Sequence, residues 1–548
     1  MVKSRVKTLD SLARVKRKIA KRYKVPCPSN IELLKAYHKL ARNKSIEKSE
    51  KIENLLRTRP IRSLSGIINV SVLTKPYPCP GKCIYCPNEK GIPKSYVSGE
   101  PAVERAKKLK YDPYLQTKKR LETLTLEGHP TDKVELRMVG GTFSFYPKKY
   151  QSWFITRCFA ACNAKPHEIH PHTKIWYGGK RKTTLKIKSL KDEQKLNEKA
   201  KHRIVGLSVE TRPDFITPEE IKWLRSLGVT MVELGVQSIY DDVLKLNRRG
   251  HGVDATVKAT KLLKDAGFKV LYQVMPNLPG SNLKKDEKMF KEIFKNPDFQ
   301  PDLLKIYPTA ILKGTLLYKW WKEKKYKPYA DVQLINLIKS IKKKIPYYVR
   351  IQRITRDIPS QSIVSGPAKI SNLRQIIARD MKKEGWQCRC IRCREVKENY
   401  PPLPKVSKDK LIQKLKLFRQ DYPASDGKEV FLNFEDKNRQ RLYSLLRLRL
   451  PSQCYKNCSH NIIPILENAA IIREIHTYGQ QLPLRREAIP EVSPQHKGLG
   501  QKLIKEAEKI TKREFNLKKI AVISGVGARD YFRKMGYKLK DEYMIKEL

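Results

Sequence analysis

The sequence contains no run of about eighteen or more apolar residues, the length that a helix needs to cross a bilayer. Its first residues, "MVKSRVKTLDSLARVKRKIAKRYK", lack the apolar central segment of a secretory signal. We therefore expect neither a membrane anchor nor export, and we expect a cytoplasmic location. Internal repeats and long low-complexity tracts are also absent.

Acidic residues are scarce relative to basic ones. The chain of 548 residues has 55 Asp and Glu against 115 Lys and Arg, a formal net charge of +60. A positive surface gains affinity for a polyanion by releasing counterions from its phosphates. Surface ion pairing, as in heat-adapted proteins, would explain many lysines but not so large an imbalance. The composition therefore favours a nucleic-acid partner.

The N-terminal region has the pattern of a basic amphipathic helix. Val6, Leu9, Leu12, Val15 and Ile19 recur at helical spacing beneath a face of lysine and arginine. Such a helix either docks on RNA or is a solvated terminal helix. We interpret residues 1–62 as a basic tRNA-binding segment.

From its length alone, we expect the chain to fold into three or four domains. Its next part, residues 63–345, alternates β-branched runs with amphipathic helical stretches. Six strand–helix units of this kind predict an α/β fold whose parallel sheet curls into a partial or full barrel, of the (βα)6 type. Chemistry would then be carried by loops at the carboxyl ends of the strands. The predicted strands are residues 68–73, 133–139, 203–209, 229–236, 269–275 and 303–308.

The pattern changes after about residue 400. Three consecutive strand patterns are followed by a helix, a strand, a second helix and a last strand, which predicts a separate α+β domain over residues 401–548. The expected elements are strands 429–436, 442–451 and 471–479, helix 495–515, strand 519–526, helix 528–537 and strand 543–547. Residues 346–400 are interpreted as a linker that contains a cysteine cluster.

Three cysteines are crowded directly after the first predicted strand. The eleven cysteines of the chain are odd in number and clustered, which favours reduced, metal-ligating thiols over disulfides. Cys79, Cys83 and Cys86 have the spacing C-x-x-x-C-x-x-C, and no other Cys or His lies between Leu73 and Pro101. Three thiolates can hold three irons of a 4Fe-4S cubane and leave the fourth iron open. Zinc or unliganded thiols are the alternatives.

This loop resembles that of the radical S-adenosylmethionine (SAM) superfamily, which has an aromatic, here Tyr85, before the last cysteine. The resemblance implies that SAM chelates the open iron and that an external electron donor drives its cleavage to a 5′-deoxyadenosyl radical. "VGGTF", with Gly140 and Gly141, matches the glycine-rich SAM contact of the superfamily. Glu210, in "LSVETRPD", falls on a strand end where it could also meet SAM.

The C-terminal domain resembles the GCN5-related N-acetyltransferases. "PQHKGLGQ" places Gln495, Gly498 and Gly500 at the mouth of a helix, where free N–H groups bind pyrophosphate. A tight turn is the alternative explanation of this glycine pair. The resemblance implies that the preceding strand and the helix start contact acetyl-CoA, and that a tyrosine lies near the thioester. The implied contacts are Glu474, Ile475, His476, Thr477, Gln495, Gly498, Leu499, Gly500, Gln501, Tyr531 and Phe532.

Both halves together resemble the family of Elongator catalytic subunits in its archaeal single-chain form. The motifs "YDPYLQT", "GGTF", "ETRPD", "ELGVQS", "NRRGH", "RDIP", "REIHTYG" and "KIAVISGVG" occur in the family's order. The resemblance implies synthesis of 5-carboxymethyluridine at the wobble position of tRNA from acetyl-CoA and SAM. It also implies that Lys133 contacts acetyl-CoA and acts with Tyr531. Phe532 stands where the family commonly has a second tyrosine, which leaves the role of that hydroxyl open.

Two other functions compete with this enzyme. One is a protein lysine acetyltransferase of the histone type, in which the iron–sulfur region is structural. The other is an acetyl-CoA-regulated tRNA-binding scaffold, which would need no open iron. Partner subunits and a homodimer are left open.

A second trio, Cys388, Cys390 and Cys393 in "CRCIRCRE", lies between the domains. Its neighbouring arginines favour thiolates, and with a distant fourth ligand it would suit a structural zinc ion. Three unliganded thiols are the alternative. A further basic stretch, "YGGKRKTTLKIK", combines Lys180, Arg181 and Lys182 with a tyrosine, as expected where phosphates and an unpaired base are bound.

Overall fold

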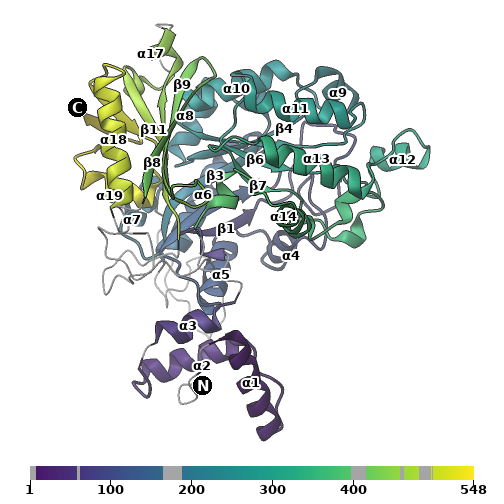
Figure 1. The fold of residues 1–548 in the computed structure, drawn as a ribbon, viewed down its shortest axis with the longest axis vertical. Coiled ribbons are helices and arrows are strands. Elements are labelled where there is room, and N and C mark those ends of the chain that lie inside the picture. The colour runs from purple at the N-terminus through teal and green to yellow at the C-terminus, as the bar shows by residue number, and fades with distance from the viewer. Residues whose placement is uncertain are drawn as a thin grey trace.

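The computed structural model describes residues 6, 8–47, 49–58, 62–164, 188–396, 415–456, 462–479, 495 and 498–548. It contains an N-terminal helical unit, a parallel half-barrel and a second sheet (Figure 1). The helical unit is α1 (Leu9–Tyr23), α2 (Asn30–Arg42) and α3 (Glu50–Leu56), which extends below the half-barrel in Figure 1. Leu12, Leu34 and Leu56 form its small core. As expected, α1 is amphipathic, although Leu9 and Ile19 on its apolar side are exposed.

The half-barrel is one sheet of seven parallel strands in the order of the chain. This topology is typical of consecutive strand–helix units with crossovers of one hand. Its strands are β1 (Ile68–Leu73), β2 (Lys133–Val139), β3 (Arg203–Thr211), β4 (Met231–Gln237), β5 (Lys269–Val274), β6 (Leu303–Ile306) and β7 (Arg350–Arg353).

Helices cover the outer face of this sheet and share one apolar core with it (Figure 1). Two of these helices begin with a capping residue followed by proline. Asp112 caps α5 ahead of Pro113, and Thr217 caps α8 ahead of Pro218. The helices of this part are α4 (Pro101–Lys108), α5 (Pro113–Leu126), α6 (Lys148–Asn163), α7 (Leu190–Asn197), α8 (Pro218–Ser226), α9 (Asp241–Leu246), α10 (Val253–Asp265), α11 (Leu283–Lys295), α12 (Leu316–Lys322), α13 (Asp331–Lys344), α14 (Leu373–Lys383) and α15 (Ile391–Arg394).

The seventh strand corrects our boundary at residue 345. β7 pairs in parallel with β6, with Leu303 opposite Arg350, so the sheet continues into residues 346–400, which we interpreted as a linker. The strand is only four residues long and has the sequence "RIQR", in which two partly buried arginines flank two buried residues. So short and basic a stretch has no clear strand periodicity, which is why sequence reasoning missed it.

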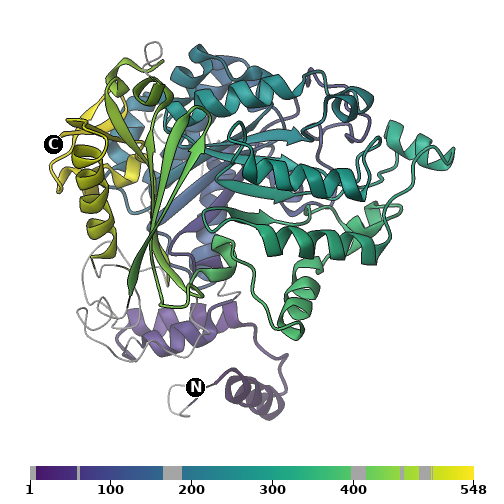
Figure 2. The same cartoon turned by 45° about the horizontal axis from the view of Figure 1, so that its top comes forward.

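The second sheet has the order β13-β14-β12-β11-β10-β9-β8, antiparallel except for the pair β11 and β12. Figure 2 shows its green strands beside the half-barrel, with the yellow C-terminal helices on the far side. Sequence reasoning missed β8, which is largely exposed along its first half, and β13, which has three exposed residues. The elements are β8 (Lys416–Ala424), β9 (Gly427–Glu435), β10 (Leu442–Leu450), α17 (Ser452–Lys456), β11 (Ala469–Thr477), α18 (Leu499–Arg513), β12 (Lys519–Val522), α19 (Arg529–Arg533), β13 (Lys538–Lys540) and β14 (Tyr543–Glu547).

The two sheets are joined by fully buried ion pairs. Nη2 of Arg473, on β11, lies 2.6 Å from Oδ1 of Asp302 in the half-barrel and 2.9 Å from Oε2 of Glu429 on β9. Although burial opposes it, the charges of Arg473, Lys264 and Arg447 hold the pKa of Asp302 well below its usual value. A charge buried this deeply is tolerated only when it is paired, so these contacts fix how the two domains dock.

Glycines allow the backbones of the two domains to touch. A Cβ at Gly525 would lie 2.2 Å from the carbonyl oxygen of Val205 on β3, and one at Gly527 would lie 2.5 Å from Cβ of Arg203. The segment after β12 therefore packs directly on the half-barrel. None of the helices in the described ranges has the length and apolar character required to cross a bilayer.

Candidate functional site

A cavity of about 560 Å³ lies between the two domains. The half-barrel contributes residues near the starts of β2, β3 and β5, and the second sheet contributes the end of β11 and the start of α18. All the residues that the sequence assigned to acetyl-CoA line this one cavity. They are Lys133, Glu474, Ile475, His476, Thr477, Gln495, Gly498, Leu499, Gly500, Gln501, Tyr531 and Phe532.

Glycines shape the wall of the cavity at the start of α18. Gly498 is the N-cap of the helix and has a φ of 81°, which an L side chain rarely adopts. A Cβ at Gly500 would lie 3.0 Å from the hydroxyl of Tyr531 and 3.9 Å from Oγ1 of Thr477. The glycines thus let α18, α19 and β11 converge at the cavity. The first turn of a helix has N–H groups without partners inside the helix, so the start of α18 can donate to an anion.

Lys133 and Gln495 link the half-barrel to the second domain. Nζ of Lys133 donates to Oε1 of Gln495 at 2.9 Å, and Nε2 of Gln495 donates to the carbonyl of Thr477 at 3.0 Å. Burial lowers the pKa of Lys133 to about 8. A Cβ at Gly66, just before β1, would lie 2.0 Å from Nε2 of Gln495. The cavity therefore needs residues of both domains in place.

Charged side chains form another part of the wall. Glu474 accepts from Nζ of Lys269 at 3.1 Å and from Nε of Arg447 at 2.8 Å. Although burial opposes it, these cations lower the pKa of Glu474 to about 2. Nε2 of His476 lies 2.6 Å from the carbonyl oxygen of Ser65, and burial lowers the pKa of this imidazole. Burial therefore favours the neutral imidazole, whereas the hydrogen bond to the Ser65 carbonyl and the charge of Glu474 oppose this fall in its pKa.

Phe532 is nearly fully buried, whereas Tyr531 is 38% exposed. The two rings meet edge to face at 5.3 Å, and Phe532 packs in the core of the second domain. Phe532 has no polar group, so among these two residues only Tyr531 can offer a hydroxyl to a ligand. Burial raises the pKa of Tyr531 to about 12, which keeps its proton in place at neutral pH.

The first cysteine trio lies at the opposite end of the same strands. Its loop follows the carboxyl end of β1, and Gly140 and Gly141 follow the carboxyl end of β2. Since β2 begins at Lys133 and rises about 3.3 Å per residue, the two regions are separated by about 20 Å along the strand. The half-barrel therefore carries two sites, one at each end of its strands.

Side chains and glycines organise the cysteine loop. Sγ of Cys79 lies 3.9 Å from Oγ1 of Thr142, directly after the two glycines. Nη1 of Arg249 lies 3.6 Å from Sγ of Cys83. A Cβ at Gly81 would lie 3.7 Å from the sulfur of Cys79 and 3.6 Å from that of Cys83. It would also lie 2.7 Å from Nη1 of Arg212, so glycine at this position lets the guanidinium approach the cysteine loop.

The donor set fits a cluster better than a single ion. Within the described residues, Cys79, Cys83 and Cys86 do not gather within 4.8 Å of one another, as ligands of one ion would. A cubane instead binds each thiolate to a separate iron, which holds the sulfurs further apart. Burial and the neighbouring charge of Cys83 raise the pKa of Cys86 to about 12. A bound metal would displace this proton and offset the repulsion between thiolates.

The predicted SAM residues lie around this loop. Gly140 has a φ of 138°, and a Cβ there would lie 1.9 Å from Oγ1 of Thr74, so only glycine fits. Gly141 has a φ of 100°. Glu210, on β3, accepts from the hydroxyl of Tyr96 at 2.9 Å and lies 3.7 Å from Nζ of Lys305. Glu210 is thus oriented by a network inside the half-barrel.

Tyr85 is partly buried beside the cysteines. Its hydroxyl has no hydrogen-bond partner among the side chains and backbone groups that the structure describes. Burial and the charge of Cys83 raise its pKa well above the usual value. Its ring packs against the aromatic cluster of α12.

Sequence reasoning missed several residues at the two sites. Arg249 and Thr142 contact the cysteine sulfurs, and Glu135 and Lys269 line the cavity. Arg249 and Thr142 stand inside the motifs "NRRGH" and "GGTF", so their signal was present but unassigned. Glu135 and Lys269 stand in the stretches "DKVE" and "GFKV", which also resemble the family, so their signal was likewise present but unassigned.

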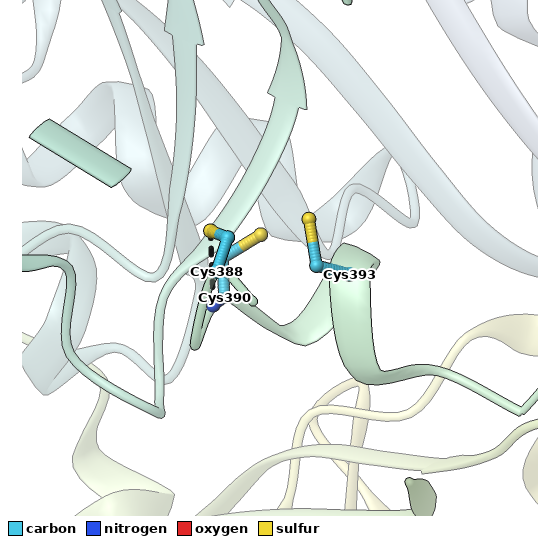
Figure 3. Close-up of side chains that lie close together, drawn as sticks. All are labelled: Cys388, Cys390 and Cys393. Atoms are coloured by element: carbon cyan, nitrogen blue, oxygen red, sulfur yellow. Dashed lines mark hydrogen bonds between the residues drawn. The ribbon is translucent and has the colours of Figure 1, made fainter. Parts of the chain in front are cut away.

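The second cysteine trio forms a compact group. The sulfurs of Cys388, Cys390 and Cys393 all lie within 4.8 Å of one another (Figure 3). Nζ of Lys342 lies 3.4 Å from Sγ of Cys393. Although burial opposes it, hydrogen bonds with Cys388 and Cys393 hold the pKa of Cys390 well below its usual value. This geometry could hold one metal ion, and within the described ranges no fourth Cys, His, Asp or Glu joins the group.

The predicted tRNA-binding residues Lys180, Arg181 and Lys182 lie outside the described residues.

A parallel half-barrel with a cysteine loop after its first strand defines a radical SAM domain, and the comparison of the chain with protein families agrees. The model of the radical SAM superfamily matches residues 77–293, and that of the radical SAM C-terminal domain matches residues 301–383. The second match includes β7, in line with the extended sheet.

Whole-chain relatives narrow this class. A tRNA uridine(34) acetyltransferase of Methanocaldococcus infernus is 45% identical, over 99% of this chain and 96% of the relative. Elongator complex protein 3 of Bos taurus is 38% identical, over 90% of this chain and 86% of the relative. The solved structure of the archaeal Methanocaldococcus infernus Elp3 with an N-terminal deletion has a TM-score of 0.72 and 44% identity, and it covers 89% of this chain and all of its own. The chain belongs to the family of tRNA uridine(34) acetyltransferases and Elongator complex protein 3.

Proposed function

We propose that the protein carboxymethylates the wobble uridine of tRNA, with acetyl-CoA as the carbon donor and SAM as the source of a radical. One observation carries this proposal: the residues assigned to acetyl-CoA, including Lys133 of the radical SAM domain, line one cavity between the two domains. The radical SAM domain thus forms part of the acetyl-CoA site, as expected if one reaction uses both cofactors, although the cysteine loop lies at the other end of the same strands.

The chemistry explains why both cofactors are needed. Uridine C5 is too weak a nucleophile for ordinary acetyl transfer, and an acetyl methyl group is hard to deprotonate in water. When bound, the cluster and SAM supply a 5′-deoxyadenosyl radical that can remove a hydrogen atom from this methyl group. When the methyl carbon bonds to C5, the C5–H bond breaks and the base loses a proton and one electron, which equals the electron spent on cleaving SAM. Hydrolysis of the thioester by one water then releases CoA and leaves a carboxymethyl group.

At the strand ends, residues of the chain hold and orient the first site. Cys79, Cys83 and Cys86 would ligate the cluster, and Arg249 would donate to the Cys83 sulfur. Gly140 and Gly141, whose φ values of 138° and 100° favour glycine, would contact the amino-acid part of SAM through their backbone. Glu210 would accept a hydrogen bond from the ligand, since Tyr96 and Lys305 fix its carboxylate.

In the cavity, the start of α18 would bind the pyrophosphate of acetyl-CoA through its free N–H groups. The end of β11, from Glu474 to Thr477, would pair with the pantetheine arm. Tyr531 would donate its hydroxyl near the thioester, because it lies over Gly500. Lys133 would contact the cofactor from the radical SAM domain.

A protein acetyltransferase in which the C-terminal domain acts alone is disfavoured by this arrangement. Lys133 and Gln495 are hydrogen-bonded across the domain boundary, and the ion pair of Arg473 and Asp302 is completely buried. A scaffold without turnover would not require the donor set around the cysteine loop.

The partners we propose are tRNA, acetyl-CoA and a one-electron donor for the cluster, in the cytoplasm. The N-terminal helices and the high positive charge support the tRNA partner. A homodimer stays a prediction from the sequence alone.

The proposal is tested with anaerobically reconstituted protein, a reductant, SAM, acetyl-CoA and unmodified tRNA. We expect 5′-deoxyadenosine and a carboxymethylated wobble uridine, both measured by mass spectrometry. Lys133→Ala should raise the KM for acetyl-CoA, because it removes a cation and the partner of Gln495.

Two outcomes would contradict the proposal. Acetylation of added peptides at enzyme-like rates, with no modified tRNA, would favour the protein acetyltransferase. Salt-sensitive tRNA binding without turnover under every reducing condition would favour the scaffold.

A further inference from the structure

Helix α12 and the residues around it form a basic, aromatic projection. Between residues 313 and 327 the chain has six lysines and one glutamate, together with Tyr318, Trp320, Trp321 and Tyr326. The six lysines are all exposed. In Figures 1 and 2 this helix stands out from the edge of the half-barrel, away from the second sheet. No part of the proposed reaction uses it.

The projection is joined to the cysteine loop by a backbone hydrogen bond. The backbone N–H of Leu317, on α12, donates to the carbonyl of Ile84 at 3.0 Å, between Cys83 and Cys86. On the other side, the N–H of Ile84 donates to the carbonyl of Asn247 at 3.3 Å. Leu317 is also part of a buried cluster against which Tyr85 packs. The position of α12 is therefore fixed relative to the site where the radical chemistry would begin.

The two sides of α12 differ. Tyr318 and Trp321, three residues apart, stack on each other with centroids 5.9 Å apart, and Nζ of Lys322 lies 5.2 Å from the Tyr318 centroid. Trp320 is not part of this stack and lines a second cavity instead. It is partly buried, so its ring is held by packing while it faces that space.

The second cavity has a volume of about 360 Å³. Its walls are Leu246, the loop 277–281 that follows β5, Trp320 and residues 325–327. No lining residue is acidic, and Lys325 and Lys327 add positive charge. The cavity lies at the carboxyl ends of the strands, as the cysteine loop does, and it shares no lining residue with the acetyl-CoA cavity.

We propose that this second cavity binds a single-stranded nucleotide next to the wobble uridine, with its base against Trp320 and its phosphates near Lys325 and Lys327. The assignment rests on the proposed function, since it takes the substrate to be an anticodon loop. Single-stranded RNA is recognised by stacking unpaired bases on aromatic rings beside basic residues, and this cavity offers both. A base held here keeps the loop open while its neighbour enters the half-barrel.

The first measurement is the affinity of an anticodon stem-loop RNA with an unmodified wobble uridine, for the reconstituted full-length protein. Trp320→Ala should weaken binding by on the order of tenfold, and Trp320→Phe should restore most of it. Lys325→Gln should reduce the slope of log affinity against log salt by about one. Trp153→Ala, at a similarly sized exposed ring on α6, is the matched control.

The second measurement is photo-crosslinking from a 4-thiouridine placed directly before or after the wobble position. We expect crosslinks to residues 316–327, lost when unlabelled stem-loop competes. Unchanged affinity in both Trp320→Ala and Lys325→Gln, with no crosslink to this segment, would overturn the inference while tRNA modification by the wild type still stands.

Two further outcomes separate this inference from the proposed function. If Trp320→Ala binds RNA normally but loses cleavage of SAM, the cavity serves SAM and the inference is wrong. If the wild type modifies no tRNA yet shows the binding losses and the crosslink, the nucleotide site stands and the proposed reaction fails.

Discussion

The chain has two groups of three cysteines, and they differ in burial and in the spacing of their sulfur atoms. Cys79, Cys83 and Cys86 lie on a partly exposed loop at the carboxyl ends of the strands, and their sulfurs do not all lie within 4.8 Å of one another. Cys388, Cys390 and Cys393 lie in or at the core, with sulfurs within 4.8 Å of one another. Open spacing suits a cluster that must meet a substrate, and compact burial suits an ion that holds the chain together. We expect the first trio to react and the second to stabilise.

The largest effect should come from Cys83→Ala. Loss of one iron ligand removes the site at which SAM would be cleaved, so tRNA modification and 5′-deoxyadenosine should both be lost completely. Stability should change by only about 1 kcal/mol, as for an ordinary substitution. Activity is measured by mass spectrometry of tRNA nucleosides, and stability by urea unfolding.

The control for this variant is Cys27→Ala, at an exposed thiol outside both trios. It should leave activity unchanged. Full activity in Cys83→Ala would remove the first trio from the mechanism and erase the contrast between the trios.

In contrast to Cys83→Ala, Cys390→Ala should lower stability strongly and leave the first cysteine trio intact. It removes a buried ligand and leaves two thiols without their shared ion, so the free energy of unfolding should fall by more than about 3 kcal/mol. Iron content at the first trio should persist in the folded fraction, as measured by metal analysis.

Cys454→Ala, at a half-buried thiol on α17, is the matched control and should cost less. If a chelator strips no metal from the wild type and leaves its unfolding unchanged, the second trio holds no structural ion.

Lys342→Gln should weaken the second trio without destroying it. Nζ of Lys342 lies 3.4 Å from Sγ of Cys393 and favours the thiolate form of the trio. Its loss should lower metal affinity about 10- to 100-fold, as for other residues that contact metal ligands. Competition with a chromogenic chelator measures this affinity, and Lys343→Gln, at the exposed neighbour, should leave it unchanged.

Arg249→Gln should have the smallest effect. Removing the guanidinium near Sγ of Cys83 takes away a positive charge and a hydrogen bond, so the cluster should become harder to reduce. We expect about tenfold lower activity and a more negative midpoint potential in a redox titration. The exposed Arg248→Gln should match the wild type; equal potentials in both variants would show that Arg249 does not act on the cluster.

Much of the fold could be predicted from the sequence, because strong local patterns coincide with the elements. Residues 68–73 and 133–139 were predicted as strands and are β1 and β2, since apolar residues alternate there and glycine or proline follows. β7 was missed because two arginines flank its two buried residues. Its place is decided by its pairing with β6, which no local pattern encodes.

In the candidate sites, too, residues in local motifs could be found from the sequence, whereas contacts between distant residues could not. Gly140 and Gly498 were found through the motifs that contain them, and their φ values of 138° and 81° explain why glycine stands at both positions. The link between Lys133 and Gln495 joins residues far apart in the chain, so only the docking of the two domains reveals it. The roles of these residues in binding stay predictions until the variants are measured.

The cavity between the domains has walls from both, and the buried pair of Arg473 and Asp302 fixes their docking. Heating should therefore melt the half-barrel and the second sheet in one transition instead of two. Acetyl-CoA at a hundred times its Kd should raise the stability of that single unit by about 2.7 kcal/mol. If the C-terminal domain alone were moved into another protein, it would bring only its own wall of the cavity. The residues of the half-barrel that complete the proposed acetyl-CoA site, such as Lys133, would be left behind.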